Sequence, residues 1–291
     1  MENHHHQHHP AAETDSAAMA DSAAMAELLD LDAEVLHSYL SEVIAWVHEL
    51  AADLPRRRIL DLGSGTGTGA LALARRFEGA DVLAVDISAR LLARLRDKAR
   101  DLGVADRVRT VQADLDAAWP AIDTVDLVWA SASLHHMADP DRVLTAVFAA
   151  IRPGGLLAVA EMDSFPRFLP DDLHHGRPGL EARCHAALAE GQADEVPHLG
   201  SDWGPRLNKA GFTIEAKRPF AIDLMPPLPA AARRYAQASL QRIRSGLDGR
   251  MSADDLATLD TLIDSDGPLG VLRRDDLTVR TTRTVWVARR P

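Results

Sequence analysis

Three aspartates could bind a polar ligand, because each follows a short apolar run in the first half of the chain. They are Asp61, Asp86 and Asp114. If the apolar runs are parallel strands, their carboxyl ends lie along one edge of a sheet and bring the three carboxylates together. A single aspartate at a strand end is often only a helix N-cap. Three aspartates at the ends of successive strands favour a ligand site. In such a site Asp86 could accept hydrogen bonds from the hydroxyls of a ribose, and Asp114 could accept one from an adenine amino group.

A glycine-rich loop follows Asp61, with glycines at the alternate positions Gly63, Gly65 and Gly67. Glycines permit unusual backbone angles and let a ligand approach without meeting a Cβ atom. The spacing from Gly65 to Ala70 also matches a variant of the dinucleotide-binding fingerprint, so a nicotinamide-dependent oxidoreductase is an alternative. Asp61 argues against it, because a carboxylate beside the loop attracts a ligand's ammonium group and repels a pyrophosphate.

Candidates for proton transfer follow two later apolar runs. His135 and His136 come after the first of them, and Glu161 and Asp163 come after the second. The ends of neighbouring parallel strands share one crevice, and histidine titrates close to neutral pH. We therefore predict His135 as a general base and Glu161 as the carboxylate that orients it. The alternative is that both histidines only cap the turn and pack against the cofactor.

The elements that would position these residues alternate along the chain. The predicted strands are 58–62, 81–85, 108–113, 125–130 and 156–160, and the predicted helices between them are 67–77, 89–102 and 141–151. Buried apolar strands separated by helices indicate a parallel sheet with helices on both faces. Two late strands, 212–218 and 280–288, could pair as an antiparallel ribbon because an insertion separates them.

The chain divides into a core and less regular segments. A disordered tail rich in His and Ala is expected over 1–24, followed by a helical lid over 25–55. The core is expected over 56–163, 201–220 and 280–291, with a lid insertion over 164–200 and a helical lid insertion over 221–279. Aromatic residues of the later segments, among them Trp203 and Tyr235, are expected either to line an apolar acceptor pocket or to pack in the core.

These motifs resemble the class I S-adenosylmethionine-dependent methyltransferases, especially the branch that acts on small molecules. The run from Asp61 to Gly67 is similar to the first motif of that family, and Asp86 to its acidic ribose ligand. Ile87 takes the place of the hydrophobic residue that covers the adenine. Asp114 and Leu115 are similar to the pair that contacts the adenine. The resemblance implies that S-adenosylmethionine is the cofactor and that these residues bind it.

The resemblance covers about residues 58–161 and includes the stretches 133–140 and 151–157. His135 and Glu161 also resemble the His–Glu dyad of polyketide C-methylating domains. The implied fold is an α/β, Rossmann-like sheet of seven strands, mostly parallel with one antiparallel strand, with helical lids. The implied reaction is methyl transfer to a small-molecule acceptor by in-line displacement. A non-catalytic module that only binds S-adenosylmethionine stays open as a further alternative.

The amino-acid composition limits the kinds of partner that the protein is expected to bind. The net charge of −11 and the lack of a basic stretch disfavour nucleic acids and membrane surfaces. The one cysteine, Cys184, forms no internal disulfide, which fits a cytoplasmic protein. Lid histidines and acids show no spacing typical of a metal site, so no metal is predicted. The oligomeric state, with a homodimer as one alternative, stays open.

Overall fold

The computed structural model describes residues 10–55, 57–191 and 196–291, and it confirms the predicted seven-stranded sheet. The strand order is β3-β2-β1-β4-β5-β7-β6. Strand β7 runs antiparallel to both of its neighbours, and the other six share one direction. The strands are β1 (Arg58–Leu62), β2 (Asp81–Asp86), β3 (Val108–Gln112), β4 (Val125–Ser131), β5 (Ile151–Met162), β6 (Thr213–Leu224) and β7 (Val279–Arg289).

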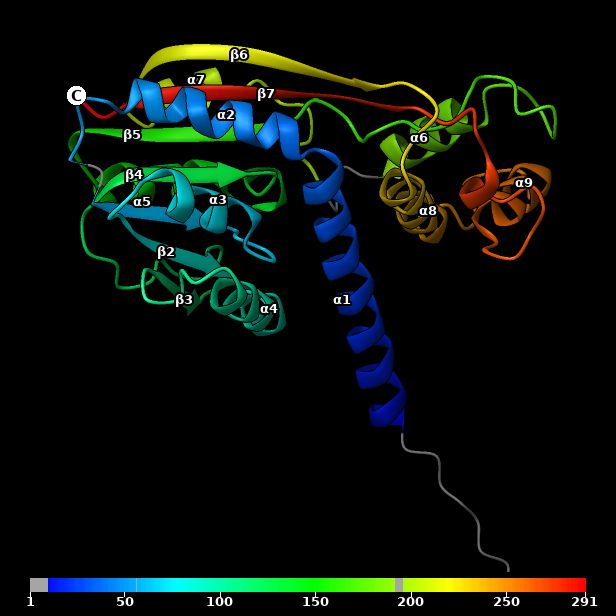
Figure 1. Ribbon diagram of the computed structural model, residues 1–291, viewed down its shortest axis with the longest axis horizontal. Helices are drawn as coiled ribbons and strands as arrows, with labels where there is room; N and C mark the ends of the chain where they lie inside the picture. The colour runs from blue at the N-terminus through cyan, green and yellow to red at the C-terminus, as the bar shows by residue number, and fades with distance from the viewer. Residues whose placement is uncertain (1–9, 56, 192–195) are drawn as a thin grey trace, which may run out of the picture.

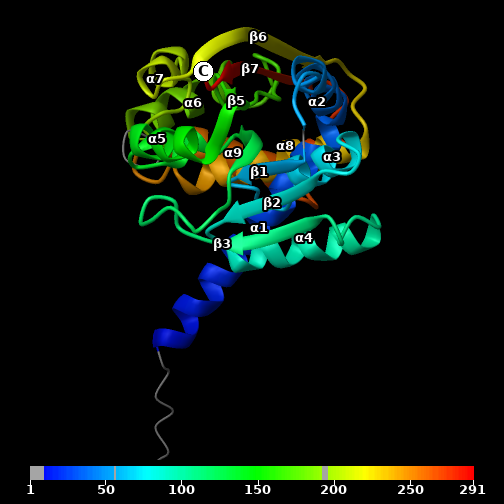
Figure 2. The same ribbon diagram turned by 90° about the vertical axis from the view of Figure 1, so that its left-hand side faces the viewer.

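Helices cover both faces of this sheet (Figure 2). On one face lie α2 (His37–Leu50), α3 (Thr68–Arg76) and α4 (Ala89–Asp101), and on the other lie α5 (Pro140–Ala150) and α7 (Gly204–Lys209). Successive side chains of a strand point to opposite faces of the sheet. Ile59 therefore packs in the hydrophobic core beneath α2, α3 and α4, and Leu60 packs in the core beneath α5 and α7. The central strands are therefore apolar on both faces, as a covered parallel sheet requires.

A second group of helices gathers at the far end of the long β6–β7 ribbon (Figure 1). It consists of α6 (Leu180–Gly191), α8 (Ala230–Ser245) and α9 (Ala253–Ile263), and the long helix α1 (Pro10–Val35) packs along α8. Polar contacts join α1 to α8, since Tyr235 donates to Asp32 at 2.7 Å and Arg234 pairs with Glu27 at 2.6 Å. The helix α1 thus lies between this group and the sheet.

The structure differs from the predicted disordered tail over 1–24. From Pro10 onwards the chain belongs to α1, whose sequence is rich in the strong helix formers Ala, Leu, Met and Glu. Residues 1–9 lie outside the described residues. The late strands are also longer than predicted, since each continues along its partner as far as Leu224 in β6 and Val279 in β7.

No helix in the described part of the chain is long and apolar enough to cross a membrane.

Candidate active site

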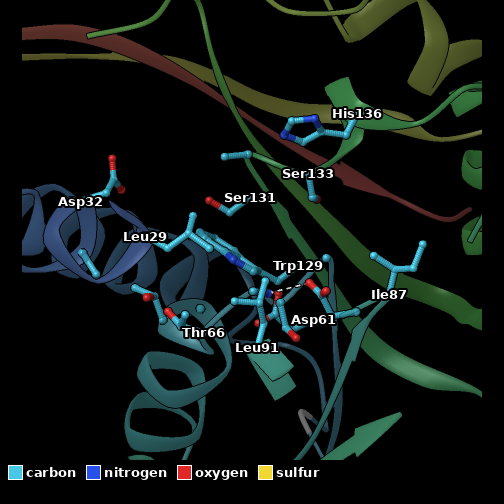
Figure 3. A pocket seen from close by; sticks show the side chains of 18 of the residues that line it. Leu29, Asp32, Asp61, Thr66, Ile87, Leu91, Trp129, Ser131, Ser133 and His136 are labelled. Atoms are coloured by element: carbon cyan, nitrogen blue, oxygen red, sulfur yellow. Dashed lines mark hydrogen bonds between the residues drawn. The ribbon is translucent and has the colours of Figure 1, made fainter. Parts of the chain in front are cut away.

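A cavity of about 410 Å³ lies at the carboxyl ends of β1, β2 and β4, where open α/β sheets bind ligands. In Figure 3, Asp32 lies on one side of it and Ile87 on the other, with Trp129 between them and His136 above. All of the predicted cofactor residues except Gly67 line this cavity. Those that do are Asp61, Gly63, Gly65, Asp86, Ile87, Asp114 and Leu115.

The glycines of the loop after β1 are required by the backbone and by close packing. Gly63 has φ of +64°, and a Cβ atom there would lie only 2.5 Å from Ser133 Cβ. Gly67 has φ of +89° and is the N-cap of α3, where a Cβ atom would overlap the side chain of Leu95. Gly67 therefore shapes the loop from behind, whereas Gly63 and Gly65 form part of the cavity surface.

The Asp86 carboxylate holds the glycine loop in place. Its Oδ2 atom accepts a hydrogen bond from Gly65 N at 2.8 Å, and its Oδ1 atom accepts one from Ser88 N at 2.8 Å. Ser88 in turn caps α4, because its Oγ atom accepts from Leu91 N at 3.3 Å. Asp86 thus joins the end of β2 to the loop after β1 while it faces the cavity.

The third aspartate serves as a turn cap and also lines the cavity. Asp114 Oδ1 accepts hydrogen bonds from Asp116 N at 2.9 Å and Ala117 N at 3.3 Å. The described chain from Asp114 to β4 contains no helix, so Asp114 caps a turn and not the helix N-terminus that the alternative interpretation of the sequence expected. Leu115 is buried, whereas Ile87 is 63% exposed at the rim, where an apolar side chain can cover a flat ligand.

The carboxyl group of Asp61 is buried at the bottom of the cavity, with an exposed fraction of 2% for the residue. Burial, together with the nearby Asp86 carboxylate, raises the pKa of Asp61 to about 7, although a hydrogen bond from Ala70 N opposes the shift. Its Oδ2 atom has no hydrogen-bond partner among the described residues. A cationic group in the cavity would favour the ionised form.

Other polar atoms around Asp61 are also buried and unpartnered within the described residues. They are Ser64 Oγ, Trp129 Nε1 and Ser133 Oγ. Each such atom costs about 1–3 kcal/mol if it stays unsatisfied. Because all of these side chains line the same cavity, a polar ligand that supplies their partners fits the site.

The structure brings His135 and Glu161 together, as their positions after β4 and β5 predict. His135 Nδ1 lies 2.5 Å from Glu161 Oε2. The other carboxylate oxygen, Oε1, accepts from Ser133 N at 3.0 Å and Leu134 N at 2.8 Å. Glu161 therefore holds the short helix η1 (Leu134–His136) through three hydrogen bonds. Both partners are buried, at 1% and 2% exposure, and neither lines the cavity.

His136 is the histidine of this turn that lines the cavity. Its ring centroid lies 4.1 Å from that of His135, so the two rings are in contact. Burial lowers the pKa of His136 to about 4, and the neighbouring His135 lowers it as well. The imidazole that faces the cavity is therefore neutral near pH 7 and can accept a hydrogen bond, but its low pKa makes it a weak base.

One wall of the cavity comes from residues that sequence reasoning missed. Asp32 of α1, Tyr39 of α2 and Arg283 of β7 line it, with apolar side chains of α1 and α2 around them. A signal was available for Arg283, since it is a charged residue inside a β-branched run near the carboxyl terminus. The aromatic residues Trp203 and Tyr235 pack in the core instead, and neither lines the cavity.

No three His, Cys, Asp or Glu side chains come together as a metal site would require, in the part of the chain that the structure describes.

A family model described as a methyltransferase domain matches residues 59–155. Among curated proteins, the chain is 30% identical over 239 residues to 27-O-demethylrifamycin SV methyltransferase of Amycolatopsis mediterranei, covering 76% of this chain and 84% of that protein. It is 39% identical over 171 residues to methyltransferase GfsG of Streptomyces halstedii, covering 58% of this chain. That second match spans 60% of the length of GfsG.

Solved structures show the same fold. A Bacillus halodurans protein superposes with a TM-score of 0.54 at 20% identity, covering 85% of this chain and 98% of that chain. The [4+2]-cyclase SpnF superposes with a TM-score of 0.51 at 22% identity, covering 86% and 81%. A cyclase on this fold means that the architecture alone does not determine the reaction.

Proposed function

Because the chain belongs to the class I S-adenosylmethionine-dependent methyltransferases, we propose that it transfers a methyl group from this cofactor to a small-molecule acceptor. The observation that carries the proposal is the buried, unpartnered carboxylate oxygen of Asp61 in a cavity bounded by the glycine loop. A ligand with an ammonium group beside an adenosine satisfies this site. The relatives with assigned activities give no support to the nicotinamide alternative, since they are methyltransferases.

When bound, S-adenosylmethionine supplies an activated methyl group on a sulfonium, which a nucleophilic atom of the acceptor displaces in line. On our proposal, Asp61 pairs with the ammonium of the cofactor, and Asp86 accepts hydrogen bonds from its ribose hydroxyls. Asp114 and Leu115 contact the adenine, and Ile87 covers it. Each of these residues lines the cavity, which supports the assignment.

A small-molecule acceptor is supported by the names of the relatives. They include methyltransferases for 27-O-demethylrifamycin SV and for trans-aconitate. The net charge of −11 agrees with such an acceptor and disfavours a nucleic acid. Both C- and O-methyltransferases occur among the relatives, so membership of the family does not specify which atom is methylated. The residues around the acceptor should determine that atom.

A base is needed when the acceptor nucleophile carries a proton. We propose that His136 orients the acceptor by accepting a hydrogen bond from its reacting group, because its neutral ring lines the cavity. The buried His135–Glu161 pair then acts as a positioning pair that holds η1. The sequence-based prediction of His135 as the base stays open. If His135→Ala lowers kcat more than His136→Ala does, with the cofactor at saturation and Tm unchanged, His135 is the base.

Calorimetry tests the cofactor assignment directly. We expect both S-adenosylmethionine and S-adenosylhomocysteine to bind the wild type and to bind Asp86→Asn at least tenfold more weakly. Asp81 provides a matched control, because it is an exposed aspartate at the opposite end of the same strand. Asp81→Asn should keep wild-type affinity. If neither compound binds the wild type, the proposed function is wrong.

We also propose that the protein works in a reducing, cytoplasmic environment, because its single cysteine, Cys184, is free and buried.

A further inference from the structure

The cofactor assignment leaves the wall formed by α1, α2 and β7 without a role. Two polar atoms on this wall, Tyr39 Oη and Arg283 Nε, are buried and have no hydrogen-bond partner among the described residues. Tyr39 is 7% exposed and Arg283 is 6% exposed, and both line the cavity. The surrounding side chains on the same wall are apolar: Met25, Leu29, Leu36 and Leu40.

The orientation of Arg283 is set by Asp32. Arg283 Nη2 donates a hydrogen bond to Asp32 Oδ1. The same oxygen accepts a second hydrogen bond from Tyr235 Oη at 2.7 Å. The guanidinium carbon lies 5.4 Å from the centre of the Tyr39 ring, so the two side chains are in contact. Asp32 balances the charge of the guanidinium, and the buried Nε–H is left as a hydrogen-bond donor without a partner among the described residues.

Tyr39 provides a second donor on the same wall. Burial raises the pKa of Tyr39 to about 12, and although Arg283 opposes this shift, the hydroxyl stays protonated at neutral pH. Buried donors are unfavourable without an acceptor. An oxygen atom of a ligand beside this wall would accept from Arg283 Nε and Tyr39 Oη.

Asp32, which pairs with Arg283 on this wall, and His136 line the same cavity from different elements. Figure 3 shows Asp32 on one side, with Ser131 between it and His136. An acceptor molecule that reaches from this wall to His136 would cross the centre of the cavity.

We propose that Tyr39 and Arg283 bind a hydrogen-bond-accepting oxygen of the methyl acceptor, which is otherwise largely apolar. This inference rests on the proposed function and adds to it the chemical class of the acceptor. The two donors select the oxygen, and the leucines and Met25 of the same wall contact the apolar part.

The test compares two probes that differ by one oxygen, 4-nitrophenol and nitrobenzene. Calorimetry measures the binding of each to the full-length protein saturated with S-adenosylhomocysteine. We expect Tyr39→Phe to weaken the binding of 4-nitrophenol about tenfold and that of nitrobenzene less than twofold. Arg283→Lys keeps a cation beside Asp32 but removes the Nε–H group, so it should have the same selective effect. The phenolate absorption band of bound 4-nitrophenol should weaken in both variants.

Tyr235→Phe is the matched control, because Tyr235 belongs to the same network but does not line the cavity. Any effect of that change should be equal for the two probes. The proposal is overturned if the wild-type complex does not bind 4-nitrophenol, or if Tyr39→Phe weakens both probes equally or neither. Failure to bind S-adenosylhomocysteine would instead overturn the proposed function, so the two failures are distinguishable.

Discussion

Replacement of Glu161 by glutamine tests whether one buried carboxylate organises the turn that carries His136. Glu161 accepts from Ser133 N, from Leu134 N and from the ring of His135. A glutamine has the same shape but a single acceptor oxygen. If that oxygen faces the two backbone amides, its NH2 group faces His135 Nδ1 and forces the imidazole into the other tautomer.

The expected loss in the free energy of unfolding follows from the three hydrogen bonds to Glu161. A hydrogen bond to a charged group stabilises by about 1.5–3 kcal/mol and a neutral one by about 0.5–1.5 kcal/mol, so each bond loses about 1 kcal/mol. Glu161→Gln should therefore reduce the free energy of unfolding by about 3 kcal/mol. At about 2–4 °C per kcal/mol for a domain of this size class, Tm should fall by about 6–12 °C.

Thermal unfolding and steady-state kinetics should be measured on the same preparations at pH 7. We expect kcat to fall with Tm, because η1 no longer holds His136 against the cavity. Glu181 offers a matched control: it is 5% exposed and accepts from Phe168 N and Leu169 N, but it belongs to the lid. Burial raises the pKa of Glu181 to about 7, so its carboxyl group is less fully ionised near neutral pH and glutamine should cost less.

Three results would refute this reasoning. A Tm within 2 °C of the wild type would mean that Glu161 does not hold the turn through charge-assisted bonds. A loss of stability with an unchanged kcat would mean that the turn is structural only and that His136 has no part in the reaction. An equal loss in Glu161→Gln and Glu181→Gln would show that any buried carboxylate is equivalent.

Further predictions concern the cofactor side of the cavity. The pKa of Asp61 is raised to about 7 in the folded protein, so the affinity for S-adenosylmethionine should rise as the pH passes through 7, with release of a proton that calorimetry in two buffers detects. Asp61→Asn should remove this pH dependence, and an unchanged dependence would contradict the pairing with the ammonium. Gly67→Ala should lower Tm and cofactor affinity together, because its φ of +89° and the side chain of Leu95 both exclude a Cβ atom. An affinity equal to that of the wild type would contradict the role of the loop.

The sheet and the cofactor side of the cavity could be predicted from the sequence because their signals are local. Asp61, Gly63, Gly65 and Asp86 lie within one strand–loop–helix–strand unit, and the spacing along the chain determines their meeting in space. The alternation of strands and helices predicted the parallel part of the sheet, whereas the seventh strand and its antiparallel direction were implied by the family resemblance. The segment from Pro10 was harder, because composition alone does not distinguish an alanine-rich helix that packs on a partner from a disordered tail.

The choice between His135 and His136 could not be made from the sequence. The two are adjacent, and both are candidates by residue type and by position after β4. Which ring lines the cavity depends on the rotation of η1, and that rotation depends on hydrogen bonds to Glu161 from a different strand. A local pattern therefore predicted the pair, but only tertiary contacts decide which member faces the cavity.

The acceptor wall combines residues from the two ends of the chain, and this explains why it escaped prediction. Arg283 and Asp32 pair across 251 positions, and Tyr39 joins them from a third element. All three lie outside residues 59–155, the part that matches the methyltransferase family, whereas the proposed cofactor residues lie inside it. If the family segment supplies the cofactor site, the flanking elements should supply acceptor specificity. Substitutions on this wall should then change which acceptor is methylated while the affinity for S-adenosylmethionine stays the same.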